Sequence, residues 1–383
     1  MDIGIDATFL PRDHRGMGMV LRNFLEGWQQ LQPDHKLYFL TSKPKLLTAI
    51  KEECSKLGPC STFSNAPKLD VVWYPWDRVD CLLPCAKVLT IHEADLWWEE
   101  RGKNRYRDWD FLAKELDHIA TVSDFNSQKL LKYFNNQSAE KITVCYNAIN
   151  DIYAEKQKDA NFNNEENHRD FRRKYTDDSP FLLFVGAPDE ERKNFLGLLE
   201  ALNILKDDNN LHVLVVGSKP NFKLSLWQNF FPNDHSKYIK AMEAQWEKVK
   251  DRVHFTGKIP PENILTIVMA YLSCEAFMAI SHHETFFLPI AEAMASQAVV
   301  ISSKESALPE IGGSETPFYY DPNTPEQLAK TIKSVLTLKK GLNEAEILPN
   351  RLLLGQTRAS QFNVCNHTKK MLEIFTKALE GKK

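Results

Sequence analysis

Two glutamates separated by seven residues carry the clearest chemical signal in the sequence. An apolar strand precedes them and Pro289 suits the first turn of a helix, so Glu284 lies in the loop and Glu292 about one turn into the helix. Two carboxylates that face one cleft can each accept hydrogen bonds from the hydroxyl groups of a sugar or a ribose. The alternatives are a capping role for Glu284 and a solvated helix position for Glu292. A metal site at His282-His283-Glu284 is disfavoured, because adjacent residues at a strand end point to opposite faces.

A pair of cations follows another apolar strand. The run FLLFVG ends at Gly186, and Arg192-Lys193-Asn194 opens the next helix. Cations are unfavourable at the positive end of a helix, so their presence there indicates an anion that binds between them. A diphosphate is the expected anion, and two solvated surface cations are the alternative.

Two further candidates lie in the first part of the chain. Gly16 and Gly18, within Arg15-Gly16-Met17-Gly18, precede the helical stretch from Val20 to Leu31 and would let a phosphate approach the backbone. This is no complete dinucleotide fingerprint, and a plain tight turn is the alternative. His92 ends a strand at the edge where ligands bind in open α/β sheets, with a satisfied structural histidine as the alternative.

Short β-branched or aromatic runs alternate with amphipathic stretches, which is typical of parallel sheets covered by helices. The expected strands of the first series are Ile3–Phe9, Leu37–Thr41, Val71–Tyr74, Val88–His92, Ile119–Ser123 and Ile142–Tyr146. Those of the second series are Phe181–Val185, Val213–Val216, Val253–Phe255, Ala276–Ser281 and Val299–Ser302. The pattern stops between about residues 151 and 179, where the Asn-rich DANFNNEENHRD indicates a linker. Apolar residues at helical spacing over 358–379 predict a closing helix.

Composition excludes several classes of protein. A chain of 383 residues is longer than a single hydrophobic core usually supports, so two domains are expected. A hydrophobic content of 43% is typical of a globular protein. A net charge of −3 argues against nucleic acid as a partner. Seven cysteines at loose spacings indicate reduced thiols and a cytoplasmic location, and a zinc site at Cys81 and Cys85 is disfavoured. We expect neither a membrane span nor a secretory signal.

Taken together, these motifs resemble the retaining glycosyltransferases of the GT-B fold, specifically glycosyltransferase family 4 (glycosyl transferases group 1). The segment HETFFLPIAEAMASQAVVISS is similar to the family's EGFGLPxLEAMAxGxPVVAS. It is accompanied, in the family's order, by RGMG, TIHEADLW, ATVSDFNSQKL, YNAIND, FVGAPDEERKN, HFTGKIPPENI and SALPEIGG. The resemblance therefore covers nearly the whole chain.

The resemblance implies an α/β protein with two doubly wound Rossmann-like domains that face each other across a cleft, and a C-terminal helix that packs back on the first domain. We expect an acceptor-side domain over residues 1–165, a nucleotide-sugar-binding domain over 166–357 and the closing helix over 358–383. The implied activity is retaining transfer of a sugar from a nucleotide-diphosphate sugar to a hydroxyl of a glycan, a lipid-linked saccharide or a small molecule. Neither a metal nor another cofactor is expected, because fixed cations and a helix N-terminus can stabilise the leaving diphosphate.

By match to the family's motifs, Glu292 binds the ribose hydroxyls and Glu284 the donor sugar, while Arg192 and Lys193 neutralise the diphosphate. His92 orients the sugar and stabilises the transition state. The donor-binding residues expected beside these are Gly16, Gly18, Gly186, Thr285, Phe286, Phe287 and Leu288.

Departures from the family's pattern bear on the donor. Thr285 and Phe287 fill positions that are commonly glycine, Gln297 replaces another glycine, and Ala187 stands where an arginine is usual. A catalytically silent GT-B subunit that acts as a binding or assembly partner is the alternative function. Peripheral membrane contact is a further expectation, through a basic and aromatic segment that contains Trp97, Trp98, Lys103, Arg105 and Arg107.

Overall fold

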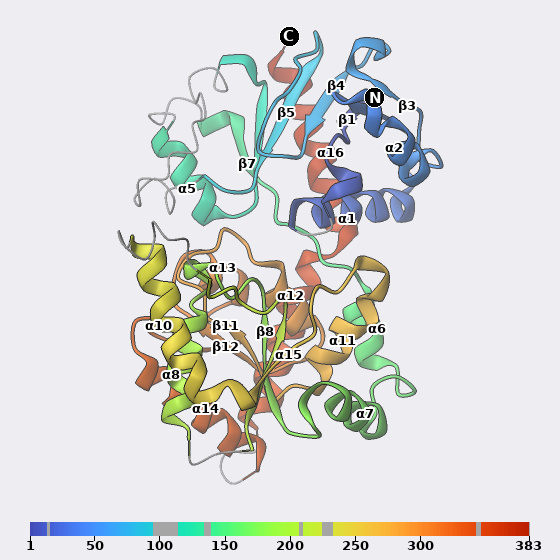
Figure 1. The fold of residues 1–383 in the computed structure, drawn as a ribbon. Coiled ribbons are helices and arrows are strands. Elements are labelled where there is room, and N and C mark those ends of the chain that lie inside the picture. The colour runs from blue at the N-terminus through green and yellow to red at the C-terminus, as the bar shows by residue number, and fades with distance from the viewer. Residues whose placement is uncertain are drawn as a thin grey trace. The chain divides into compact units, whose positions relative to one another are not determined.

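The computed structural model describes residues 1–13, 16–94, 114–133, 139–206, 210–223, 233–341 and 346–382. The chain divides into two compact units (Figure 1). The first consists of Met1–Asn150 together with Phe362–Lys383, and the second of Asp151–Gln361. Each unit is a parallel sheet covered by helices, as the alternating pattern predicted.

The first unit contains a parallel sheet in the order β3-β2-β1-β4-β5-β6-β7. Its strands are β1 (Asp2–Asp6), β2 (Lys36–Thr41), β3 (Cys60–Thr62), β4 (Val71–Tyr74), β5 (Ala86–Ile91), β6 (His118–Thr121) and β7 (Ile142–Val144). Its described α-helices are α1 (Gly16–Leu31), α2 (Leu47–Cys54), α5 (Asp124–Tyr133) and α16 (Val364–Gly381). Because β1 lies between β2 and β4, the chain changes direction across the sheet at β1, which creates a topological switch point.

The second unit repeats this design in a sheet of order β10-β9-β8-β11-β12-β13. Its strands are β8 (Phe181–Val185), β9 (His212–Val216), β10 (Val253–Phe255), β11 (Ala276–Ala279), β12 (Val300–Ser303) and β13 (Phe318–Tyr320). Its described α-helices are α6 (Ile152–Lys158), α7 (Glu165–Thr176), α8 (Phe195–Ile204), α10 (Asp234–Val249), α11 (Ile264–Ser273), α12 (Leu288–Ala295), α13 (Leu308–Gly312), α14 (Pro325–Lys339) and α15 (Ile347–Ala359). The switch point here lies between β8 and β11.

The predicted closing helix is α16, which packs against α1 in the first unit (Figure 1). The two helices approach so closely that a Cβ at Gly27 would lie 2.3 Å from the carbonyl oxygen of Val364. Thr368 Oγ1 donates to the carbonyl of Phe24 at 3.1 Å, and the Phe24 ring meets that of Trp73 at 4.8 Å. The C-terminal helix is therefore part of the first unit's core.

The predicted linker is wrong, because the segment folds as α6 and α7. Tyr153 and Phe171 are buried, and the Asn164 side chain accepts a hydrogen bond from the N–H of Asn167 at the start of α7. Helices α6 and α7 pack on α11 and α12 of the second unit. The boundaries between the units accordingly fall after residues 150 and 361, whereas the sequence suggested 165 and 357.

The predicted strands are all present, with ends that differ by a few residues. The edge strands β3 and β13 were missed. Each has three residues, as do the edge strands β7 and β10, which were predicted. Strand β3 (Cys60–Thr62) differs from those two because it contains no large apolar residue. Within the described ranges, no helix is long and apolar enough to cross a membrane. The basic and aromatic segment proposed for membrane contact, Trp97 to Arg107, lies outside those ranges.

Candidate functional site

A buried ionic cluster occupies the switch point of the second unit. Strand β8 leads through Gly186 to a 3-10 turn over Glu191–Lys193, and β11 leads to the loop that carries Glu284. The backbone N–H of His282 donates to the carbonyl of Arg192 at 2.7 Å, which joins the two loops directly. The sequence thus places cations after one strand and a carboxylate after its neighbour, and the parallel sheet brings them together.

Glu284 bridges both cations of this cluster. Lys193 Nζ lies 2.5 Å from its Oε1, and Arg192 Nη1 lies 3.1 Å from its Oε2. Ser281 Oγ also donates to Oε1 at 2.8 Å, and the N–H of Glu284 donates to Ser306 Oγ at 2.8 Å. Lys193 and Glu284 are buried, so this is not a surface ion pair.

Burial and charge act in opposite directions on these groups. Burial alone disfavours the charged carboxylate of Glu284, but the charges of Lys193 and Arg192 outweigh it and hold its pKa below the usual value. Burial also lowers the pKa of Lys193, and the carboxylate of Glu284 opposes that change. Arg192 also forms an ion pair with Glu190, whose Oε2 lies 2.8 Å from Nη2. The cluster therefore joins two cations to two carboxylates, and an anion that displaced either carboxylate would interact strongly with the cations.

Phe287 completes the cluster in an unusual backbone conformation. It caps α12 with a φ of 71°, in the left-handed region that favours glycine. Its ring lies under the ammonium of Lys193, which is 4.6 Å from the ring centroid. The sequence comparison identified the missing glycine, and the structure shows that phenylalanine adopts the glycine-like conformation and covers the lysine. Gln297, at another departure, likewise has a positive φ of 54°.

Glu292 has different partners. Tyr271 Oη donates to its Oε2 at 2.9 Å, and Tyr153 forms a second hydrogen bond to the carboxyl group. Burial raises the pKa of Glu292 to about 7, although both hydrogen bonds lower it. Glu292 is half-buried, so the solvated helix position considered for it is wrong. Neither tyrosine was predicted as a partner of Glu292. Tyr153 lies in the segment that was predicted to be a linker, and Tyr271 lies in the apolar helix α11.

The remaining predicted residues of the second unit line the same loops. Gly186 follows β8 directly, and a Cβ there would lie 3.7 Å from the Lys193 side chain. Phe286 is buried, whereas Thr285 and Leu288 are half-buried at the start of α12. Helix α12 begins at Leu288. Pro289 has no N–H and the N–H of Ile290 donates to the carbonyl of Phe287, so the N–H of Leu288 is the one that the start of the first turn can offer to a ligand.

The candidates of the first unit lie at its carboxyl edge and at the start of α1. His92 follows β5; its N–H donates to Asp77 Oδ1 at 2.5 Å, and its Nε2 lies 3.0 Å from the carbonyl of Pro75. Helix α1 already begins at Gly16, earlier than predicted, and a Cβ at Gly18 would lie 1.9 Å from the carbonyl oxygen of Asp13. Gly18 is therefore needed for packing. A Cβ at Gly16 would meet open space, and Arg15 lies outside the described residues.

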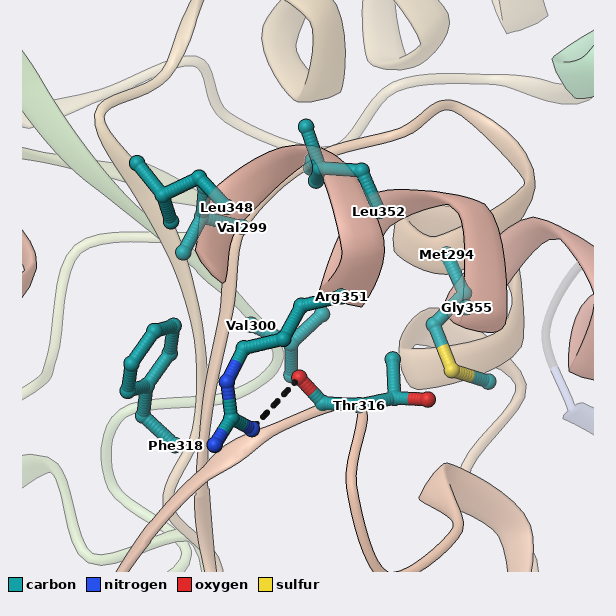
Figure 2. A pocket seen from close by; sticks show the side chains of 10 residues that line it. Met294, Val299, Val300, Thr316, Phe318, Leu348, Arg351, Leu352 and Gly355 are labelled. Carbon is teal, nitrogen blue, oxygen red and sulfur yellow. Dashed lines mark hydrogen bonds between the residues drawn. The ribbon is translucent and has the colours of Figure 1, made fainter. Parts of the chain in front are cut away.

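Other sites are less suited to chemistry. Within the described residues no cluster of three or more histidine, cysteine or acidic side chains could hold a metal, and all seven cysteines are free thiols. An apolar cavity of about 10 Å³ lies under α15, lined by Met294, Val299, Phe318, Leu352 and neighbouring residues (Figure 2). Arg351 closes it by donating to the carbonyl of Thr316, and its volume has room for one water at most. It is a packing defect and not a ligand site.

Comparison with known proteins identifies a family for about half of the chain. Residues 164–347 match the family described as glycosyl transferases group 1. Escherichia coli O-antigen chain mannosyltransferase B is 25% identical over 253 residues, which are 64% of this chain and 60% of that protein. The E. coli serotype-specific mannosyltransferase WbdA is 21% identical over 69% of this chain and 29% of its own length. The alignments thus span less than two thirds of these relatives.

Solved structures share the fold over almost the entire chain. A glycosyltransferase from Rickettsia africae is 17% identical with a TM-score of 0.69, covering 99% of this chain and 98% of its own. Anabaena Alr3699/HepE, solved in complex with UDP and glucose, is 14% identical with a TM-score of 0.70, covering 98% of this chain and 99% of its own. At these identities the likeness establishes the fold, which is GT-B. Residues 164–347, just under half of the chain, therefore match the glycosyl transferases group 1 family, and the fold of the whole chain is the GT-B fold.

Proposed function

We propose that the protein is a retaining glycosyltransferase that moves a sugar from a nucleotide-diphosphate sugar to an acceptor hydroxyl. The observation that carries this proposal is the buried cluster of Arg192, Lys193 and Glu284 at the switch point of the second unit. The buried Lys193 and the half-buried Arg192, beside a helix N-terminus, supply positive charge where a leaving diphosphate develops negative charge. The family match and the mannosyltransferase relatives support the same reaction.

Glu284 has two roles in this proposal. Before the donor binds, its carboxylate holds Arg192 and Lys193 in place and offsets their charges. When the diphosphate takes over the cations, the carboxylate can accept hydrogen bonds from the donor sugar's hydroxyls. Backbone N–H groups around Phe286 to Leu288, at the start of α12, complete the diphosphate site in this proposal.

The reaction then needs no protein nucleophile. The bond between the anomeric carbon and the diphosphate oxygen breaks while the acceptor oxygen bonds to the same face of that carbon. The acceptor's proton goes to the departing phosphate oxygen. His92 orients the sugar, Gly16 and Gly18 bring backbone close to the donor, and Glu292 binds the ribose hydroxyls. We propose no metal for the chemical step, so transfer should persist in chelator.

Thermal shift with UDP and GDP, followed by transfer assays with their sugars, tests this function. Mannose is the first sugar to try, with a saccharide acceptor, because both relatives are named mannosyltransferases. A bound diphosphate should raise the melting temperature by linkage. Lys193→Gln should abolish that shift, whereas Lys250→Gln, on the exposed surface, should keep it.

Glu284→Gln separates binding from chemistry. Turnover should fall at least a hundredfold while the diphosphate still binds, because the lost interaction is with the sugar and not with the phosphates. Normal turnover in both Lys193→Gln and Glu284→Gln would refute the assigned roles. A protein that binds diphosphate but transfers no sugar from any donor would instead be the silent subunit.

A further inference from the structure

A second cluster of charged and aromatic side chains lies at the carboxyl edge of the first unit's sheet. Phe9 follows β1, Lys43 follows β2 and Arg78 follows β4. Lys43 Nζ is 4.6 Å and Arg78 Cζ 5.2 Å from the centroid of the same Phe9 ring. Loops from three neighbouring strands thus gather two exposed cations on one half-buried ring.

A chain of hydrogen bonds fixes these loops relative to one another. Asp6 Oδ1 accepts from the N–H of Thr8 at 3.0 Å, and Thr8 Oγ1 accepts from the N–H of Ser42 at 3.0 Å. Ser42 Oγ then donates to Asp80 Oδ2 at 3.3 Å, and Arg78 Nε donates to Asp80 Oδ1 at 2.7 Å. The cations are therefore presented by a preorganised edge and not by independent surface loops.

The cluster stands at the switch point between β1 and β4. Trp76 spans it, since its Nε1 donates to the carbonyl of Asp6 at 2.6 Å and its ring lies 5.7 Å from that of Phe9. In open α/β sheets, ligands bind beyond the carboxyl ends of the strands at such a point. The ionic cluster around Glu284 occupies the equivalent place between β8 and β11 in the second unit. The same rule therefore indicates a ligand site here.

The charge balance indicates what this ligand is. Asp80 neutralises Arg78, but among the described residues no carboxylate lies within ion-pair distance of Lys43. Both cations lie over the Phe9 ring. The ring therefore holds the side chains of Lys43 and Arg78 in place and is not open for stacking on a sugar. Lys43 therefore carries a positive charge that no described carboxylate pairs with, and an oxyanion placed at the cluster would interact favourably with it and with Arg78.

A buried carboxyl group lies beneath the cluster. Asp6 is fully buried, and burial raises its pKa to about 6, with smaller effects from Thr8, Asp80 and Arg78. Its Oδ2 has no hydrogen-bond partner among the described residues. With a pKa of about 6 this carboxyl group is mostly ionised at neutral pH, so its negative charge offsets part of the positive charge of Arg78.

The cluster also adjoins His92. The residue before Arg78 is Asp77, whose Oδ1 accepts the backbone N–H of His92. The loop that carries Arg78 is therefore tied to the histidine that the proposed function places beside the reacting sugar. A ligand held here would lie beside the loop that is bonded to His92.

We propose that Lys43 and Arg78, held on the Phe9 ring at the β1/β4 switch point, bind an oxyanion carried by the acceptor, either a phosphate or a carboxylate on a sugar. This inference rests on the proposed function, because it names the chemical class of the acceptor.

Calorimetric titration tests the site while UDP or GDP saturates the donor site. The probes are mannose 6-phosphate, glucuronate and the neutral methyl α-mannoside. At least one anionic probe should bind at least tenfold more tightly than the neutral one. Lys43→Gln and Arg78→Gln should each weaken that binding tenfold or more. A response to the phosphate alone or to the carboxylate alone identifies which oxyanion the site takes, and either supports the inference.

The matched control is Lys45→Gln, an exposed lysine in the same loop that does not lie on Phe9, which should bind the probes like the unmodified protein. Equal binding of neutral and anionic probes, or unchanged binding in both Lys43→Gln and Arg78→Gln, would overturn the inference. Lys193→Gln tells the two proposals apart, since it should lose the diphosphate response and keep the anionic probe. A diphosphate response without any anionic probe binding would reject only the acceptor site.

Discussion

The strained conformation of Phe287 is the most unusual feature at the scale of single residues. A side chain with a Cβ is disfavoured at a φ of 71°, yet this residue caps the helix beside Lys193. Strain of this kind persists where surrounding contacts enforce it, and it is concentrated at functional sites. Here the contact of the ring with Lys193 is one such enforcing interaction.

Two substitutions at this position test the backbone conformation. Phe287→Ala and Phe287→Gly both remove the ring, but only glycine fits the left-handed region without strain. We therefore expect Phe287→Gly to be more stable than Phe287→Ala by about 1 kcal/mol in urea unfolding. At an ordinary helix position the alanine variant is more stable than the glycine variant. A Phe287→Ala protein more stable than Phe287→Gly would therefore contradict the positive φ.

The two glutamates should give stability opposite dependences on pH. The pKa of Glu292 rises from 4.5 to about 7 on folding, so its favourable contribution is present at low pH and is lost as pH rises through 7. Raising the pH from 5 to 8 should cost the unmodified protein up to roughly 3 kcal/mol relative to Glu292→Gln. Unfolding titrations of both proteins across this range measure the difference.

Glu284 provides the comparison for that measurement. Its pKa is lowered on folding, so its contribution is present above the unfolded value and is lost as pH falls. The stability difference between the unmodified protein and Glu284→Gln should therefore shrink on acidification. Parallel pH profiles for the two variants would show that one of the two environments is wrongly described.

Sequence reasoning found the charged residues of the site but not all of their partners. Arg192, Lys193 and Glu284 could be grouped because cations and acids at strand ends meet at one edge of a parallel sheet. The tyrosines around Glu292 could not be found, because α11 reads as apolar and α6 was taken for a linker. Their contact with Glu292 depends on helix packing, which local spacing does not encode.

At the scale of elements, pattern length decides what is predictable. Buried strands such as β8 and β11 read as apolar runs, whereas β3, with three residues and none of them large and apolar, gives no such signal. Helix α7 was not predicted, because Phe171 is its one large buried side chain and the other residues are mostly polar. One apolar residue gives no helical period. Its capping residue Asn164 was present in the sequence, but it stood in an Asn-rich run that favoured a loop.

The contact of α1 with α16 gives a prediction at this scale. A side chain at Gly27 would collide with the backbone of Val364, so Gly27→Val must separate the helices or strain them. We expect a loss of about 1–3 kcal/mol in unfolding free energy. Gly381→Ala, in open space at the end of α16, is the control and should change stability little. A Gly27→Val protein as stable as the unmodified one would show that the helices do not approach this closely.

At the scale of the whole molecule, both units carry their charged cluster at the same topological position. Each sheet reverses its strand order beside its first strand, β1 or β8, and cations follow that strand or its neighbours. The fold thus provides one ligand-binding position in each unit, at the same place in the strand order. The side chains at the two positions differ in burial. The second unit buries its ion pairs, whereas the first exposes Lys43 and Arg78. This difference suits a tightly held donor and a more loosely held acceptor.

Hydrogen exchange can test whether the two positions act separately. A nucleoside diphosphate should slow exchange in peptides that cover residues 186–194 and 281–290, because its binding orders the loops after β8 and β11. Mannose 6-phosphate or glucuronate should slow exchange over residues 41–46 and 74–80 instead. Lys193→Gln should remove only the first effect and Lys43→Gln only the second. If both ligands protected the same peptides in the unmodified protein, the molecule would hold one anion site and not two, and the assignment of donor and acceptor to different switch points would fail.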